Sequence, residues 1–311
     1  MSKKIKLYML SGFLGAGKTT FLKSVLNDIS DKKVGVLMNE FGKISIDGEI
    51  VKRDGLELVE INRGSIFCSC LKLSFVDTMC KMADLDLDYL FVESSGLADP
   101  SNVDDILFGV KHNKGDFYDY KGIISIVDAL HFFDQLEDLE TVERQIKHCH
   151  LAVINKTDLV DKETVEKIKE KITEINPKTT IQEASFAKFN YDFLNEDLLK
   201  NQWAESEETT NTKENKPKTL MLTYEGVVNK EDLTKYLEEV SKHTFRMKGF
   251  VKLDDGWNQV DVVNRKIDYK PCEEKPEGCQ LVLISKIGPA IIKPAIETWK
   301  ELIPVEMKLK N

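Results

Sequence analysis

A glycine-rich octapeptide close to the start of the chain, Gly12-Phe13-Leu14-Gly15-Ala16-Gly17-Lys18-Thr19, constrains the fold more than any other segment. It follows the apolar run 6–10 and precedes an amphipathic segment over residues 20–29, so it joins an expected strand to an expected helix. Glycines in such a turn let backbone N–H groups wrap phosphate oxygens at close range. This order of strand, loop and helix predicts an α/β fold that binds a phosphate group.

Short apolar runs alternate with helical patterns through the first two thirds of the chain. The runs at residues 34–38, 89–92, 123–127 and 151–154 have the length and the β-branched or aromatic content of buried strands. Residues 162–175 repeat apolar side chains at three- and four-residue steps, which is typical of an amphipathic helix. The alternation predicts the P-loop NTPase architecture, a parallel sheet with helices on both faces.

The composition of the chain changes after Trp203. Residues 204–218 are rich in Glu, Thr, Asn and Lys and have no apolar period, as expected of a polar linker. Beyond the linker we expect strands and helices in mixed order, with strands at 219–224, 245–253, 257–269 and 281–285 and helices at 230–240 and 289–302. The predicted organisation is a P-loop domain over residues 1–203, a linker over 204–218 and a smaller α+β domain over 219–311.

Charge and composition argue against several classes of partner. The 311 residues include 44 basic and 53 acidic side chains, a net charge of −9, whereas nucleic-acid and anionic-membrane surfaces need an excess of Lys and Arg. No apolar run approaches the roughly 20 residues of a membrane span. Six cysteines at irregular spacings do not form a disulfide framework, which favours a reducing compartment. We therefore expect a cytoplasmic protein without a nucleic-acid or membrane partner.

The phosphate loop predicts a site for a nucleoside triphosphate with Mg²⁺. Lys18 can bridge the β- and γ-phosphates, and the Thr19 hydroxyl can ligate Mg²⁺. The expected phosphate-binding residues are Gly12, Gly15, Ala16, Gly17, Lys18, Thr19 and Thr20.

The segment Asn155-Lys156-Thr157-Asp158, directly after the expected strand 151–154, indicates which nucleotide base the site prefers. A carboxylate at Asp158 can accept from the N–H groups on the Watson–Crick side of guanine, whereas adenine presents an acceptor there. Behind a phosphate loop, Asn155, Lys156 and Asp158 therefore predict GTP and GDP as ligands. The motif argues against the alternative of a small-molecule kinase, which needs ATP.

A second acidic motif, Glu93-Ser94-Ser95-Gly96-Leu97-Ala98-Asp99-Pro100, closes the expected strand 89–92. Glu93, at the end of a strand next to the phosphate-loop strand, is well placed to hold Mg²⁺ through its water shell. Gly96 allows close approach to the γ-phosphate, whose presence its N–H can sense.

Taken together, these residues resemble the CobW-like GTPases, relatives of the hydrogenase and urease nickel-insertion GTPases. Besides the phosphate loop, the resemblance is carried by residues 39–42 with Asp47, 93–100, 155–159 and 246–250. The resemblance implies a nucleotide switch with slow hydrolysis of GTP to GDP and phosphate. It also implies a metallochaperone that delivers a metal to a client metalloenzyme or corrinoid protein.

By position, the resemblance makes Asn39-Glu40-Phe41-Gly42 through Asp47 the first switch segment. Glu40 would be a metal-facing carboxylate, and Asp47 a candidate for positioning Mg²⁺ or water. The expected catalytic set is then Lys18, Thr19, Asp47, Glu93 and Gly96.

The metal motif departs from the family pattern. Relatives usually carry Gly-Cys-x-Cys-Cys after the first switch, whereas here Gly64 is followed by Ser65-Ile66-Phe67-Cys68-Ser69-Cys70. Two thiols at i and i+2 reach one ion only if the chain bends, because a straight strand holds them about 7 Å apart. In a bent loop, Cys68, Cys70 and Glu40 would form an exchangeable site for Zn²⁺ or Co²⁺. His148-Cys149-His150 and the pair Cys272 and Cys279 are weaker candidates.

Two functions remain open at this point. The leading hypothesis is a metallochaperone in which the nucleotide state controls delivery of Zn²⁺ or Co²⁺. The alternative is a GTP-driven assembly or reactivation factor for a corrinoid or other metallo-cofactor enzyme, which carries no metal itself; Ser65 and Phe67 at family cysteine positions favour it. The second domain is expected to provide a client or self-association surface, so a homo-oligomer is a further expectation.

Overall fold

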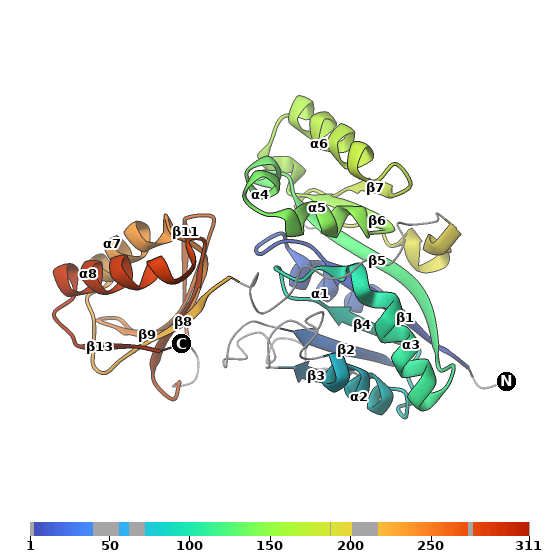
Figure 1. Ribbon diagram of the computed structural model, residues 1–311, viewed down its shortest axis with the longest axis horizontal. Helices are drawn as coiled ribbons and strands as arrows, with labels where there is room; N and C mark the ends of the chain where they lie inside the picture. The colour runs from blue at the N-terminus through green and yellow to red at the C-terminus, as the bar shows by residue number, and fades with distance from the viewer. Residues whose placement is uncertain are drawn as a thin grey trace. The chain divides into compact units, whose positions relative to one another are not determined.

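The computed structural model describes residues 3–39, 56–61, 72–186, 188–200, 217–272 and 276–310. Four predicted site residues, Glu40, Asp47, Cys68 and Cys70, lie outside these ranges. The chain divides into two compact units, Met1–Asn215 and Lys216–Asn311 (Figure 1). Most of the predicted linker also lies outside the described residues, so its boundaries stay a prediction.

Among its described residues, the first unit contains a sheet of seven strands, all paired in parallel. The strands are β1 (Ile5–Ser11), β2 (Val34–Asn39), β3 (Leu56–Ile61), β4 (Tyr89–Glu93), β5 (Tyr118–Asp128), β6 (Leu151–Asn155) and β7 (Thr180–Glu183). Their order across the sheet is β3-β2-β4-β1-β5-β6-β7. The predicted α/β class is confirmed, and β3 and β7 are strands that the sequence patterns did not indicate.

Helices cover both faces of this sheet. They are α1 (Lys18–Asp28), α2 (Lys72–Met82), α3 (Val103–Lys114), α4 (Phe132–Asp138), α5 (Glu140–Lys147) and α6 (Lys162–Ile175), as Figure 1 shows. Tyr8 and Leu10 of β1 share a core with Phe21 and Val25 of α1. Leu7 and Met9 alternate with these residues along β1, so their side chains point to the opposite face of the sheet. They are equally buried. The central strand is therefore covered on both sides.

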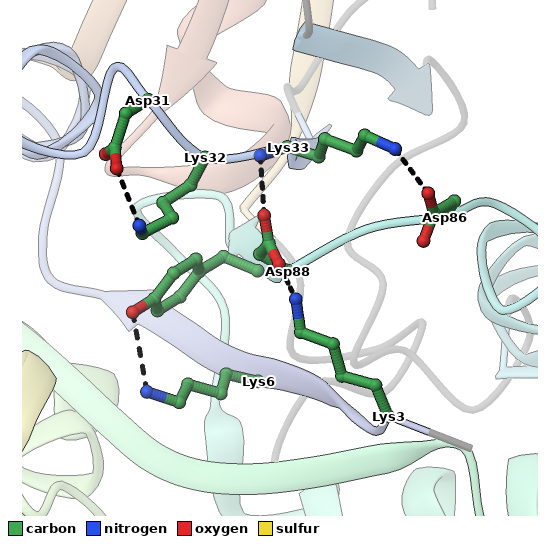
Figure 2. Close-up of polar contacts among 8 residues, drawn as sticks. Lys3, Lys6, Asp31, Lys32, Lys33, Asp86 and Asp88 are labelled. Atoms are coloured by element: carbon green, nitrogen blue, oxygen red, sulfur yellow. Dashed lines mark hydrogen bonds and ion pairs between the residues drawn. The ribbon is translucent and has the colours of Figure 1, made fainter.

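The amino-terminal edge of the sheet is bordered by paired charges. Asp88, just before β4, accepts a hydrogen bond from Lys33 N at 2.9 Å and forms an ion pair with Lys3. Lys33 also pairs with Asp86, and Lys6 Nζ donates to Tyr89 Oη at 3.4 Å. Figure 2 shows these contacts joining the segments that enter β1, β2 and β4. These contacts join the starts of three neighbouring strands and stabilise this edge of the sheet.

In the part of the second unit that the structure describes, six strands form an antiparallel sheet accompanied by two α-helices. The strands are β8 (Thr219–Tyr224), β9 (Thr244–Leu253), β10 (Gly256–Val263), β11 (Lys266–Pro271), β12 (Cys279–Ser285) and β13 (Met307–Lys310), and the helices are α7 (Lys230–Ser241) and α8 (Ile292–Leu302). The strand order is β11-β10-β9-β12-β8-β13. The smaller α+β domain is thus confirmed.

The prediction of a single strand over residues 257–269 is wrong, because two strands, β10 and β11, occupy this range. Asn264 and Arg265 both have positive φ, 51° and 64°, and form a two-residue turn that separates β10 from β11. Such a turn matches the twist of the two flanking strands, which pair as a hairpin. Strand β13 was not expected either.

The core of the second unit lies between its sheet and its helices. Trp299 of α8 is 1% exposed, contacts Tyr236 of α7 edge-on, and packs against Tyr224 of β8. Its indole N–H donates to Val305 O at 2.7 Å, which satisfies the buried polar atom. Across both units, none of the helices in the described ranges is long and apolar enough to cross a membrane.

Candidate nucleotide-binding site

The carboxyl ends of four neighbouring strands bring the predicted residues together. Strand β1 leads into the phosphate loop, and β4, β5 and β6 end at Glu93, Asp128 and Asn155. Because these strands are parallel, their carboxyl ends meet at one edge of the sheet, where open α/β sheets bind ligands.

The phosphate loop depends on a glycine at its first position. Gly12 has φ +129°, and a Cβ there would lie 2.2 Å from Ile126 O of β5, which no side chain allows. The loop ends at Gly17, after which α1 begins at Lys18. The helix therefore starts where backbone N–H groups and its dipole favour an anion.

Lys18 is held inside this loop. Its side chain is largely buried, and its Nζ donates to Gly12 O at 2.8 Å and to Phe13 O at 3.1 Å. These two hydrogen bonds hold the Lys18 ammonium against the phosphate loop and so place a positive charge there.

Thr19 and Glu93 meet beside the loop. Thr19 Oγ1 donates to Glu93 Oε1 at 2.9 Å, and Glu93 is only 7% exposed. A hydroxyl and a carboxylate are hard oxygen donors of the kind that Mg²⁺ prefers. The side chains present therefore fit the ion that the sequence predicted.

Gly96 packs directly on the phosphate loop. A Cβ at Gly96 would lie 2.5 Å from Leu14 N, so a larger residue would push the two loops apart. The segment that closes β4 and the phosphate loop thus touch through their backbones.

Residues 155–158, here termed the base loop, are bonded to the phosphate loop at two points. Asn155 Nδ2 donates to Ala16 O at 2.9 Å, and Lys156 Nζ donates to Gly15 O at 2.8 Å. Lys156 has a left-handed backbone with φ 64°. Thr20, the remaining predicted residue of the phosphate loop, lies exposed in the first turn of α1.

Asp158 is held by the segment after β7. Its Oδ1 accepts a hydrogen bond from Phe186 N at 2.8 Å, and Thr157 Oγ1 donates to Ala184 O at 3.0 Å. Phe186 is 76% exposed and has φ 50°. The contact between the base loop and residues 184–186 was not expected, because no motif in the sequence marks these residues.

Asp128 is a further site residue that the motifs did not announce. Its buried carboxylate accepts from Lys156 Nζ at 2.7 Å and from Leu130 N at 3.2 Å. The signal that could have found it is its place at the end of the expected strand 123–127, equivalent to that of Glu93 after 89–92.

The weaker metal candidates have structural roles. Cys149 donates to Ile146 O at 3.2 Å, and burial raises the pKa of its thiol to about 12. His150 Nδ1 accepts from Ile123 N at 3.0 Å, and burial lowers the pKa of this histidine to about 4. Within the described ranges, no three His, Cys, Asp or Glu side chains are grouped so as to hold a metal.

Cys272 and Cys279 lie too far apart to share an ion. Cys272 follows β11 and Cys279 begins β12, and β10 and β9 lie between these strands. Three strand spacings amount to roughly 14 Å. Cys279 instead lies against Gly226 O, 3.8 Å from its Sγ.

Family profiles match most of the chain. The profile "CobW/HypB/UreG, nucleotide-binding domain" matches residues 6–183, and "Cobalamin synthesis protein cobW C-terminal domain" matches residues 218–298. The first match alone includes every described residue of the candidate site except Phe186 and Ala184.

Curated relatives are similar over part of their length. The zinc chaperone YjiA of Escherichia coli (strain K12) is 30% identical over 183 residues, which are 57% of this chain and 56% of YjiA. The zinc-regulated GTPase metalloprotein activator 1 of Dictyostelium discoideum is 26% identical over 215 residues, 58% of this chain and 45% of that protein. The chain thus spans about half the length of the curated relatives it matches.

A solved structure has the same fold. The Zn(II)-bound YjiA GTPase from E. coli aligns over 97% of this chain and 99% of its own, with a TM-score of 0.50 and 22% sequence identity. At this identity the likeness shows the common fold of the two chains.

Proposed function

Because the chain belongs to the CobW/HypB/UreG family, as its motifs predicted, we propose that it binds GTP, hydrolyses it slowly to GDP and phosphate, and couples nucleotide state to the handling of a metal. The metal is Zn²⁺ or Co²⁺ as a cargo, and its destination is a client metalloenzyme or corrinoid protein. Relatives named as a zinc chaperone and as a zinc-regulated metalloprotein activator support this proposal.

One observation carries the proposal: the phosphate loop is bonded to both neighbouring functional segments. Thr19 contacts Glu93 on one side, and Ala16 accepts from Asn155 on the other. A phosphate loop alone suits any nucleotide, whereas a carboxylate at Asp158 beside it selects guanine through the ring N–H groups. The proposed nucleotide-binding set is Gly12, Gly15, Ala16, Gly17, Lys18, Thr19, Thr20, Asn155, Lys156 and Asp158.

Hydrolysis needs the attacking water held and the charge on the phosphates stabilised. Lys18 supplies charge stabilisation at the β- and γ-phosphates, and the N–H of Gly96 meets the γ-phosphate. Thr19 and Glu93 would hold Mg²⁺, which neutralises phosphate charge when bound. Asp47, outside the described residues, is proposed to position Mg²⁺ or the water.

Cargo binding is assigned to Glu40, Cys68 and Cys70, which also lie outside the described residues. Two thiolates and a carboxylate leave a tetrahedral ion with an open position, which suits exchange better than permanent storage. In this proposal GTP assembles the site and hydrolysis releases the ion to the client.

Anaerobic titration of the reduced protein with Zn²⁺ and Co²⁺ tests the proposal, with Mg²⁺ and either GDP or a non-hydrolysable GTP analogue present. We expect stoichiometric binding with thiolate-to-cobalt absorption that differs between the two nucleotide states. The Cys68→Ser/Cys70→Ser variant is expected to lose it, and a Cys80→Ser variant, whose thiol is in α2, is the matched control.

The second candidate function is a GTP-driven assembly or reactivation factor that carries no metal. Ser65 and Phe67 at two family cysteine positions favour it. Absence of cysteine-dependent metal binding in either nucleotide state, with GTP binding intact, would leave this function. Activation of a client by the Cys68→Ser/Cys70→Ser variant would then establish it.

We further propose that the protein acts in the cytoplasm and associates with itself or with its client through the second unit. Irregularly spaced cysteines suit a reducing compartment, and the acidic balance of the chain does not suit nucleic acid. Sedimentation with GDP and with the GTP analogue measures the self-association directly.

A further inference from the structure

Gln145 of α5 is bonded to the loop that follows β4. The side chain is 1% exposed, and its Nε2 donates to Gly96 O at 3.2 Å and to Ala98 O at 2.9 Å. An amide nitrogen has two hydrogens, so one side chain serves both carbonyls. Because the two carbonyls are on alternate residues, Gln145 fixes the course of the backbone from Gly96 to Ala98.

Arg144, the neighbouring residue of α5, holds the next part of the same loop. Its Nε donates to Asp99 Oδ2 at 2.8 Å, and the Asp99 side chain has 0% exposure. Asp99 Oδ1 also accepts from Ser101 N at 3.0 Å, which caps the short turn Pro100–Asn102. A buried carboxylate loses much of its stabilisation when its cationic partner is removed, so this contact strongly specifies the position of Asp99.

The loop held in this way rests on the phosphate loop. Gly96 lies so close to Leu14 N that even a Cβ would clash at 2.5 Å. A shift of the Gly96 backbone by about an ångström is enough to spoil a positioned contact with a reacting group. Helix α5 therefore fixes the position of residues 96–99 against the phosphate loop, although neither Arg144 nor Gln145 belongs to a phosphate-binding motif.

From these contacts we propose that Arg144 and Gln145 are positioning residues, here termed the α5 clamp, which hold Gly96 where its N–H meets the γ-phosphate of GTP. GDP lacks this phosphate, so the α5 clamp sets the affinity for GTP relative to GDP. The inference rests on the proposed function, because it takes GTP as the ligand.

Gln145→Met tests the α5 clamp, since methionine nearly keeps the side-chain volume and removes both donors. Gln135→Met is the matched control: Gln135 of α4 is also buried, and its Nε2 makes no hydrogen bond to the described residues. Fluorescent GDP and a non-hydrolysable GTP analogue are titrated into each variant and into the unaltered protein with Mg²⁺, and melting temperatures are recorded in parallel.

We expect Gln145→Met to weaken binding of the GTP analogue by about tenfold, as loss of positioning hydrogen bonds does, and to leave GDP affinity within about twofold. Gln135→Met is expected to leave the ratio of the two affinities unchanged. Lower stability alone reduces binding of both nucleotides in parallel, so the ratio distinguishes positioning from stability.

Arg144→Lys is the second variant, because lysine keeps the positive charge but not the planar donor geometry that meets Asp99. If Gln145→Met does not fold, the ratio of GTP-analogue affinity to GDP affinity in Arg144→Lys provides the test. An unchanged ratio of the two affinities in the folded variants overturns the α5 clamp and leaves the proposed function intact. Failure of both variants to fold makes α5 a folding element, which also overturns the α5 clamp. Failure of the unaltered protein to bind either nucleotide overturns the proposed function instead.

Discussion

The ammonium of Lys156 lies 2.7 Å from the carboxylate of Asp128, whose side chain has 0% exposure. The same ammonium donates to Gly15 O at 2.8 Å. One lysine thus joins the base loop to the end of β5 and to the phosphate loop. The two residues are 28 positions apart in the chain, so this pair forms only when the fold brings β5 and the base loop together.

Asp128→Asn is expected to weaken GDP and GTP binding by about tenfold or more. The neutral amide loses the charge-assisted hydrogen bond to Lys156, which is then free to leave the phosphate loop. Calorimetric titration measures the change, and Asp134→Asn on the exposed face of α4 is the control. Equal affinities of Asp128→Asn and the unaltered protein would show that the pair does not support the nucleotide.

Thr19→Ala is expected to abolish most of the effect of Mg²⁺ on GTP affinity. The hydroxyl that meets Glu93 is one of the oxygen donors proposed for the ion, and alanine offers no substitute. Titrations of GTP analogue with Mg²⁺ and with a chelator give the ratio to compare. Thr19→Ser retains the hydroxyl and should restore the ratio; if it does not, the hydroxyl is not the ligand.

Asp158→Asn is expected to exchange the preferred base from guanine to xanthine. Guanine presents a 2-amino donor to the carboxylate, whereas xanthine presents a carbonyl oxygen that an amide N–H can meet. We expect GDP affinity to fall by about a hundredfold and xanthosine diphosphate to bind more tightly than GDP. Competition between the two nucleotides measures this, and a variant that still prefers GDP would remove Asp158 from base recognition.

His150 is expected to make stability depend on pH below neutrality. Burial lowers the pKa of this side chain to about 4, below its ordinary 6.5, so between these values the unfolded chain binds the extra proton. Stability contributed by the neutral imidazole is then present above about pH 6.5 and is lost as pH falls toward 4, by at most about 1.4 kcal/mol per pH unit. Urea unfolding at pH 5 and 7 measures the slope.

The control for this prediction is His150→Asn, whose side-chain oxygen can accept from Ile123 N in place of Nδ1 but does not titrate. The variant is expected to show a smaller difference in unfolding free energy between pH 5 and 7. An identical difference in both proteins would assign the pH dependence to other groups.

Asp88→Ala is expected to reduce the unfolding free energy by about 1–2 kcal/mol without changing nucleotide affinity. The substitution removes the acceptor of Lys33 N and the partner of Lys3 at the amino-terminal edge of the sheet (Figure 2). Glu137→Ala, at an exposed position of α4, is the control for a surface carboxylate. Loss of GDP binding at protein concentrations where the variant is folded would contradict the assignment of this edge to stability alone.

The central strands and the phosphate loop could be predicted from the sequence, whereas short strands at sheet edges could not. β7 and β13 lie at the edges of their sheets, and neither contains a buried residue. Edge strands of this kind carry no continuous apolar run, which is the signal that identified β1, β4 and β6. Likewise Asn264-Arg265 forms a turn without the glycine that usually marks one.

The sequence by itself determined which residues are available for the proposed ligand: a glycine-rich loop at the end of the first strand, a carboxylate at Asp158 and an acid at the end of a buried strand. These signals are local, because each depends on residue types at fixed spacing along one strand, turn or helix. Only the tertiary structure decided that Asp128 meets Lys156 and that Gln145 meets Gly96. Those contacts join residues 28 and 49 positions apart, and they follow from the order of strands across the sheet, which no local spacing encodes.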